Sequence, residues 1–181
     1  MQRCRIPRPC GNWPKLKLSP LGLLMVPMIR VKYIDQRRQS RTAALQSLFA
    51  ADVRGIWNDP LLEWLDEDED LPQNSIGFAQ ELLGGVSQSR LGLDNVITRY
   101  APAWPVSQLS VIDRNILRIA LFELIYTPGT PRKTAINEAV ELAKIFGSES
   151  SARFINGVLG SAMSGLESGE IATIEPVPEG R

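Results

Sequence analysis

The sequence predicts an all-α fold: a single-domain helical bundle in two helical halves. Between residues 38 and 165, apolar side chains recur at the three- and four-residue spacing of one helix face in successive segments. Glycine and proline stand between these segments, where helices end. The chain has 181 residues, 44% of them apolar and 22% charged, which is typical of one globular domain with a sizeable core.

Residues 1–34 precede the helical pattern and are expected to form a basic, disordered extension. They contain five prolines and no acidic residue, a composition that does not favour packed structure. The apolar run at 18–29 is interrupted by proline, is too short to span a bilayer and is followed by no signal-peptide cleavage pattern. Met25 and Met28 lie just before the helical pattern, and translation is expected to begin at one of them.

The first predicted helix runs from Arg38 to about Val53, with an arginine cluster just before it and on its first turn. The start of a helix is electropositive, so arginines there are destabilising unless an anion is present. Phosphate would relieve this conflict, because backbone N–H groups and guanidinium groups can bind the same oxygens. The apolar face of this helix consists of Ala44, Leu45, Leu48 and Phe49.

The middle of the sequence predicts a loop or short helix at 54–73 and two helices at 75–88 and 91–100. The acidic run 66–70 is expected to be solvated, because consecutive acids repel one another and resist burial; a docking tail for a basic protein is the alternative. Paired glycines at 84 and 85 predict a close helix crossing.

A proline-containing segment at 102–110 is interpreted as the joint between the two halves, with Ser107 or Ser110 as the N-cap of the next helix. That helix, at about 108–126, is apolar on nearly all sides and is predicted to be the central buried helix. Arg118 and Glu123 lie within it. A buried charge without a partner is strongly unfavourable, so both are expected in structural ion pairs.

The last two predicted helices meet at Gly147. The first of them carries Ile136, Val140, Ala143 and Phe146 on one face. Gly147 is expected to end it in the left-handed conformation, and Ser148 is expected to cap the next helix. The domain is predicted to span residues 35–165, followed by a flexible tail at 166–181.

Composition excludes several classes of function. Histidine is absent, which removes histidine-dependent catalysis and nearly all catalytic zinc sites. Cys4 and Cys10 fit neither a redox motif nor a zinc site, so free thiols and a reducing cytoplasm are expected. No nucleotide-binding or nucleophile motif occurs. We therefore predict a non-enzymatic protein without cofactor or metal.

The net charge of zero hides a division along the chain. Residues 1–41 hold ten Lys and Arg against one acid, a net charge of +9, so the remainder has ten basic and 19 acidic residues, a net charge of −9. A basic end suits a polyanion, and an acidic body suits either solvent or a basic protein partner.

Three blocks of sequence resemble the NusB family in the same order. They are RRQSRTAALQSLFAAD at 37–52, VIDRNILRIALFEL at 111–124, and AINEAVELAK followed by RFINGVL within 132–160. The resemblance covers residues 36–165 and implies a bundle of about seven helices that acts in transcription antitermination. Such proteins bind single-stranded boxA RNA of ribosomal RNA leaders together with a small-subunit ribosomal protein, NusE, and help RNA polymerase pass terminators.

The resemblance also implies site residues. The RNA-binding positions are Arg37, Arg38 and Arg41, with Lys144 and Arg153 as an extension of the RNA track. The residues that match positions in contact with the ribosomal protein are Asp113, Phe146 and Ser150. The resemblance also implies the transcription elongation complex as a partner. Some family members dimerise, so a second copy of the chain is another expected partner. No contact with a membrane is expected.

Two alternatives from other classes stay open. One is a protein-docking helical module whose arginines are merely solvated. The other is an RNA-binding domain related to the helical domain of rRNA cytosine methyltransferases, although the sequence leaves no room for their catalytic part.

Overall fold

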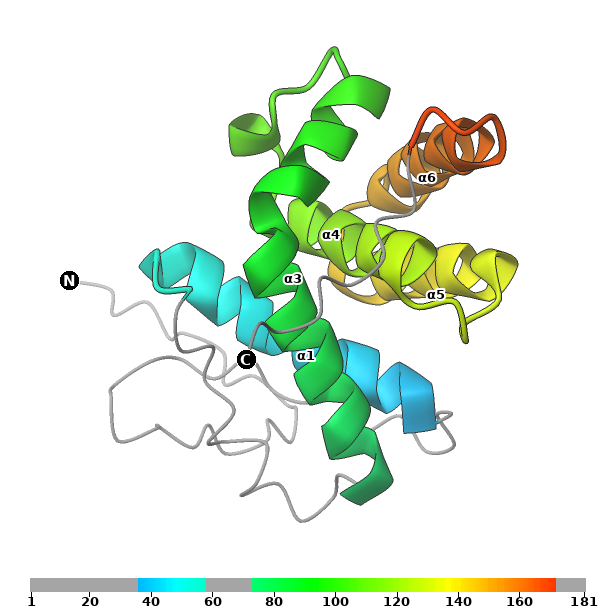
Figure 1. The fold of residues 1–181 in the computed structure, drawn as a ribbon. Coiled ribbons are helices and arrows are strands. Elements are labelled where there is room, and N and C mark those ends of the chain that lie inside the picture. The colour runs from blue at the N-terminus through cyan, green and yellow to red at the C-terminus, as the bar shows by residue number, and fades with distance from the viewer. Residues whose placement is uncertain (1–35, 58–72, 172–181) are drawn as a thin grey trace, which may run out of the picture. The chain divides into compact units, whose positions relative to one another are not determined.

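The structure, a computed structural model, describes residues 36–57 and 73–171, where helices joined by loops and turns are the only regular secondary structure (Figure 1). Five α-helices and one 3-10 helix follow one another in these residues, which confirms the all-α fold class. The predicted extension 1–34, with Cys4 and Cys10, and the acidic run 66–70 lie outside the described residues. The helices are α1 Gln36–Arg54, α3 Gln73–Tyr100, η1 Val106–Gln108, α4 Val111–Tyr126, α5 Arg132–Phe146 and α6 Ser151–Glu167.

Helix α1 begins two residues before the predicted start and buries a face of small and medium apolar side chains. A polar contact fixes its start against α3: the Ser40 hydroxyl donates to the backbone carbonyl of Ser75 at 2.7 Å. Ser40 is fully buried, and the Gln36 carbonyl of its own helix, at 3.0 Å, is a second acceptor within reach of its hydroxyl. The buried apolar residues of α1 are Ala43, Ala44, Leu45, Leu48 and Ala51.

Helix α3 is one continuous helix of 28 residues, so the prediction of separate helices at 75–88 and 91–100 was wrong. Its buried side chains keep helical spacing through the expected break, and a glycine inside a helix lowers its propensity by only about 1 kcal/mol. The predicted close crossing is confirmed at Gly85, where a Cβ would lie 2.0 Å from the Phe122 ring of α4. The buried apolar residues of α3 are Ala79, Leu82, Leu83, Val86, Leu93 and Ile97.

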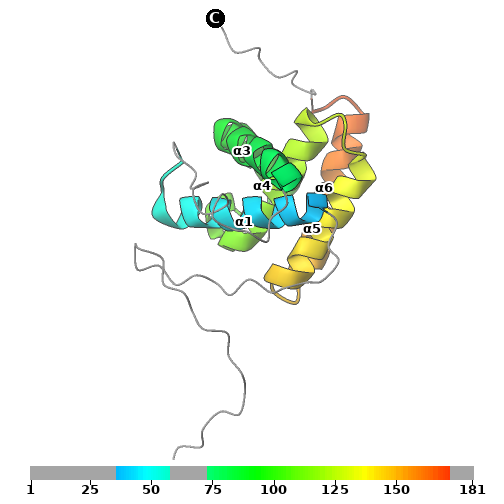
Figure 2. The same ribbon diagram turned by 90° about the horizontal axis from the view of Figure 1, so that it is seen from below.

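Helix α4 is the central helix, as predicted. It packs against α1, α3, α5 and α6 (Figures 1 and 2), and every residue from Asn115 to Ile125 is buried. Of the two candidate caps, Ser110 is the N-cap, and its hydroxyl accepts a hydrogen bond from the Asp113 N–H at 3.0 Å. The helix therefore starts at Val111 rather than 108.

The break between α5 and α6 differs from the prediction. Gly147 has φ −89° and ψ −176°, an extended conformation that any residue can adopt, so the expected left-handed glycine was wrong. Glycine is required there by crowding, since a Cβ would meet the Ala143 carbonyl oxygen at 2.7 Å and the Ser151 Cβ at 2.5 Å. Ser148 does not cap α6 with its side chain; its N–H donates to the Ser151 hydroxyl at 2.8 Å.

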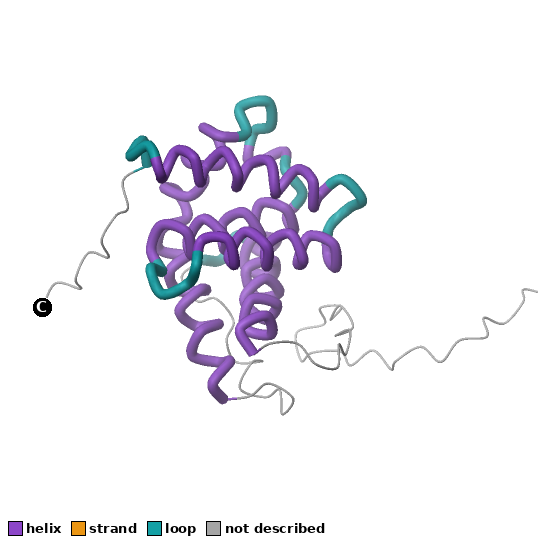
Figure 3. Tube along the Cα trace, turned by 90° about the vertical axis from the view of Figure 1, so that its right-hand side faces the viewer, coloured by secondary structure: helices purple, strands orange, loops and turns teal. Residues whose placement is uncertain are grey.

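The fold continues past residue 165, where the domain was expected to end. Leu166 is buried in the core, and α6 runs to Glu167. The Ile171 N–H donates to the Gly165 carbonyl at 3.1 Å, and Glu170 pairs with Arg99 of α3 at 2.9 Å. Residues 166–171 thus link the end of α6 to α3, and Figure 3 shows the loop that follows this last helix in teal.

Candidate nucleic-acid interface

Arg37 is exposed on the first turn of α1. Its Nη1 donates to the Thr130 hydroxyl at 3.3 Å, just before α5 begins. Its guanidinium also lies over the Phe78 ring of α3, 5.1 Å from the ring centroid. This contact orients a cation on an aromatic face while the residue as a whole remains accessible to solvent.

Arg38 is partly buried and pairs with Glu138 of α5. Its Nε donates to Glu138 Oε2 at 2.7 Å and its Nη2 to Glu138 Oε1 at 2.5 Å, a bidentate arrangement. The Arg38 side chain is 31% exposed and the Glu138 side chain 12% exposed. The pair therefore lies at the rim of the core, where one partner still meets solvent.

Arg41 is a structural residue, so its expected part in RNA binding is not supported by its position. Its side chain is 2% exposed, and it donates to both carboxylate oxygens of Glu123 at 2.9 and 2.7 Å. The Glu123 side chain is 1% exposed. A nucleic acid cannot reach Arg41 without breaking this buried pair, which would be strongly destabilising.

The conflict expected at the start of α1 is thus resolved within the protein. No acidic residue lies in the first turn of α1, but Glu123 and Glu138 reach it from α4 and α5. The hydrogen bond from Arg38 and the positive charges of Arg38 and Arg41 hold the pKa of Glu138 below its ordinary value, although burial acts in the opposite direction. Glu138 therefore remains ionised.

Two basic residues next to Arg37 were missed by the sequence analysis. Arg132 and Lys133 are the first two residues of α5 and follow closely after Thr130, which accepts the hydrogen bond from Arg37. Lys133 is exposed and Arg132 partly so. The signal was present in the sequence, but only the fold brings the start of α5 beside the start of α1 (Figure 2).

The other expected RNA-binding residues lie elsewhere. Lys144 is near the end of α5 and pairs with Glu141 at 2.6 Å, and Arg153 is exposed in the first turn of α6. Twelve residues of helix separate Lys144 from Arg132, about 18 Å at 1.5 Å per residue. The basic residues therefore form two groups, one at each end of α5.

The residues expected to contact a protein partner lie at the second of these ends. Phe146, half-buried, is the last residue of α5, and Ser150 is exposed just before α6. Because α4 and α5 pack together and a short turn joins them, Asp113 in the first turn of α4 lies at the same end. One carboxylate oxygen of Asp113, Oδ1, is buried and accepts no hydrogen bond within the described part of the chain.

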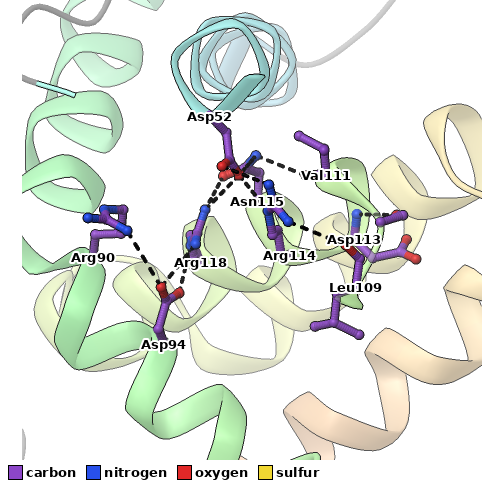
Figure 4. Close-up of polar contacts among 10 residues, drawn as sticks. Asp52, Arg90, Asp94, Leu109, Val111, Asp113, Arg114, Asn115 and Arg118 are labelled. Atoms are coloured by element: carbon purple, nitrogen blue, oxygen red, sulfur yellow. Dashed lines mark hydrogen bonds and ion pairs between the residues drawn. The ribbon is translucent and has the colours of Figure 1, made fainter. Parts of the chain in front are cut away.

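A second ionic network fastens the other end of α1 (Figure 4). Asp52 accepts hydrogen bonds from Arg114 at 2.6 and 2.8 Å, from Arg118 at 2.9 Å and from Asn115 at 3.0 Å. Arg118 also donates to both oxygens of Asp94 on α3, at 2.7 and 3.0 Å. The expected ion pairs of Arg118 and Glu123 are both confirmed. This network is buried or partly buried and links three helices.

Burial raises the pKa of Asp52, but the hydrogen bond from Arg114 and the charges of Arg118 and Arg114 outweigh it and leave the pKa below its ordinary value. Among the described residues, no group of three or more His, Cys, Asp or Glu side chains is placed to hold a metal ion. No described helix has both the length and the apolar character needed to cross a bilayer.

These features define an all-helical bundle with solvent-facing arginine at the start of its first described helix, the type of surface that binds polyanions. The chain belongs to the NusB family: the model of that family matches residues 38–164. It is 46% identical over 139 residues to the transcription antitermination protein NusB of Chloroflexus aggregans, covering 76% of this chain and 93% of the relative.

Solved structures agree with this assignment. The T. maritima NusB structure is 33% identical, with a TM-score of 0.65, and covers 75% of this chain and 97% of that one. A structure of the antitermination factors NusB and NusE in complex with double-stranded RNA is 23% identical, with a TM-score of 0.63, and covers 71% of this chain and 96% of that one. At that identity the likeness shows the fold alone. The resemblance seen in the three sequence blocks is confirmed.

Proposed function

We propose that this protein is a transcription antitermination factor. It binds single-stranded boxA-like RNA of ribosomal RNA leaders together with a NusE-type ribosomal protein, in the cytoplasm, and helps the elongation complex pass terminators. One observation carries this proposal: the 46% identity to a transcription antitermination protein that this chain matches over 93% of its length. A protein of the same fold has been solved together with NusE and double-stranded RNA, the two kinds of partner proposed for this chain.

The proposed activity is assembly, without a bond made or broken. The alternative of a domain related to rRNA cytosine methyltransferases finds less support, because the match extends over nearly all of a protein that is itself an antitermination factor. The docking-module alternative gains one argument from the structure, since Arg38 and Arg41 are both paired with carboxylates. It therefore remains the competitor that an experiment has to separate.

The proposed RNA surface is the start of α1 together with the start of α5. Arg37 is exposed there, Arg38 is partly exposed, and Arg132 and Lys133 lie beside them. Arginine suits this role because its planar fork binds phosphate bidentately and stacks on unpaired bases. A strand that begins at Arg37 and follows α5 would reach Lys144 and Arg153 at the far end.

The proposed protein-binding surface is that far end, around Asp113, Phe146 and Ser150. The buried Asp113 oxygen without a hydrogen-bond donor supports this assignment, because an unsatisfied buried acceptor is unfavourable and a partner could supply the donor. Since the basic residues around Arg37 and this surface lie at opposite ends of α5, a substitution at Arg37 leaves the protein-binding surface unaltered.

The test is a titration with single-stranded boxA-like RNA at two salt concentrations, with and without the ribosomal protein. We expect Arg37→Gln to lower RNA affinity and to make the slope of log affinity against log salt shallower by about 0.7, the value for one phosphate contact on a single strand. Its affinity for the ribosomal protein should not change. Asp113→Asn is the matched variant. It should lower the affinity for the ribosomal protein and leave the RNA affinity unchanged.

Binding of boxA-like RNA that is unchanged in both Arg37→Gln and Arg38→Gln would overturn the RNA surface and favour the docking module.

A further inference from the structure

Glu138 stands between two arginines of α1. Both of its oxygens accept hydrogen bonds from Arg38, and the Glu138 Oε2 lies 3.7 Å from Arg41 Nη1. Helix α5 places this carboxylate less than two turns after the basic residues of its own first turn. An anion therefore already occupies the arginine cluster in which RNA phosphate is proposed to bind.

The charges in this cluster cancel. Arg38 and Arg41 contribute two positive charges, and Glu123 and Glu138 contribute two negative ones. An approaching phosphate meets a neutral cluster flanked by Arg37, rather than the three uncompensated arginines that the sequence indicated. The arginines alone do not set the strength of RNA binding at this place.

The two ion pairs are not equally exchangeable. The Arg41–Glu123 pair is almost completely buried, so separating it would leave a charge in the core. The Arg38–Glu138 pair lies at the rim, with Arg38 31% and Glu138 12% exposed, so solvent screens it more than the buried pair. Phosphate and carboxylate bind the same fork of a guanidinium group in the same bidentate geometry. The rim pair is therefore the one that RNA can exchange.

We propose that Glu138 is a built-in competitor of RNA phosphate for Arg38, and that it limits the affinity of the RNA surface. This inference rests on the proposed function. When RNA binds, a backbone phosphate takes the place of the Glu138 carboxylate on Arg38. Glu138 still lies beside Arg41, whose Nη1 is 3.7 Å from its Oε2.

The test is a double-mutant cycle of Arg38→Gln and Glu138→Gln, measured with a single-stranded boxA-like RNA oligonucleotide. Glu138→Gln should raise RNA affinity about two- to fivefold, the range set by the weak pairing of a partly exposed ion pair. In the Arg38→Gln background the same substitution should have little effect.

Two further variants separate local competition from a general change in charge. Glu81→Gln removes the same charge from an exposed position on α3, three residues after Phe78, and should raise affinity less and equally in both backgrounds. Glu138→Asp keeps the charge but shortens the side chain, so it should raise affinity if the contact with Arg38 is what matters. Glu138→Asp also provides the test of the proposal if Glu138→Gln does not fold.

The outcomes are distinct. If Arg38→Gln binds RNA as well as the original protein does, both this inference and the RNA surface at Arg38 are overturned. If Arg38→Gln weakens binding but Glu138→Gln leaves it unchanged or weaker, the inference alone is overturned, and Glu138 only positions Arg38. An equal gain from Glu138→Gln in both backgrounds also overturns it.

Discussion

Three arginines at adjacent turns of one helix have three different environments. Arg37 is exposed over Phe78, Arg38 is at the rim with Glu138, and Arg41 is buried with Glu123. The spacing places Arg37 and Arg41 four residues apart on one helix face, and both guanidinium groups lie over the same ring. The difference between them is burial. Arg37 is accessible to a ligand, whereas Arg41 is buried and stabilises the fold.

The Arg41–Glu123 pair predicts a large effect on stability. Arg41→Met should lower the free energy of unfolding by about 3–5 kcal/mol, because Glu123 is left charged and buried without its partner. Chemical denaturation measures this directly. Arg37→Met is the matched control and should lower it by less than about 1 kcal/mol, since Arg37 is exposed.

A double variant, Arg41→Met with Glu123→Leu, should recover most of that loss, because a buried ion pair can be replaced by apolar side chains of similar volume. If Arg41→Met and Arg37→Met unfold at the same denaturant concentration, the structural role of Arg41 is wrong.

For single residues, the sequence indicated that a buried charge needs a partner, but it did not indicate which residue that partner is. Glu123 and Arg118 were expected in ion pairs because they interrupt an apolar helix. Their partners Arg41 and Asp52 lie 82 and 66 residues away along the chain, and local spacing carries no information about such distances. For the same reason Arg41 was expected to bind RNA, although its charge was already committed.

Helices were predicted better than the joints between them. Apolar spacing reports the buried face of a helix, so α1 and α4 were expected within a few residues of their observed bounds, and α5 and α6 were expected on either side of Gly147. The points at which helices end depend on tertiary contacts, which apolar spacing does not report. Glycines near the middle of α3 do not end it, and Gly147 ends α5 in an extended conformation under crowding from Ser151 and Ala143.

The crossing of α3 and α4 predicts opposite effects for two neighbouring glycines. At Gly85 an added Cβ would lie 2.0–2.8 Å from the Phe122 ring, so Gly85→Ala should destabilise the protein by about 1–3 kcal/mol through overpacking. At Gly84 nothing lies within 4 Å of such a Cβ, so Gly84→Ala should stabilise it by up to about 1 kcal/mol through helix propensity.

Thermal unfolding of the two variants checks this pair of expectations. Because Phe122 stacks on Tyr126 with ring centroids 5.2 Å apart, the ring has little room to move aside. Equal melting temperatures for Gly84→Ala and Gly85→Ala would show that the two helices do not approach closely at Gly85.

Helix α4 packs against each of the other four described α-helices. Helix α1 is attached to the rest of the bundle by ionic contacts at both of its ends. The start of α1 is held by Glu138 and Glu123, and its end by the network of Asp52 with Arg114, Asn115 and Arg118. The proposed RNA surface lies at the first of these attachments. The attachments are ionic, so the docking of α1 depends on the charge state of a few carboxylates.

This arrangement predicts how stability changes with pH. The pKa values of Asp52 and Glu138 in the folded protein lie below their ordinary values of 3.8 and 4.5. The unfolded state therefore binds protons first as the pH falls, and the stability that these groups contribute is fully present above about pH 5 and is lost progressively below it. Burial opposes the shift at Asp52, but the arginines outweigh it, so both groups act in the same direction.

Chemical denaturation at pH 7, 5, 4 and 3 tests this expectation. The free energy of unfolding should be nearly constant from pH 7 to 5 and should fall below that. Asp52→Asn should be less stable at pH 7, because Arg114 and Arg118 lose their shared carboxylate, yet its stability should fall less steeply in acid. Glu81→Gln is the control and should follow the original protein, since Glu81 is an exposed acid on α3. If Asp52→Asn loses stability in acid as steeply as the original protein does, the attachment of α1 through Asp52 does not account for the acid sensitivity.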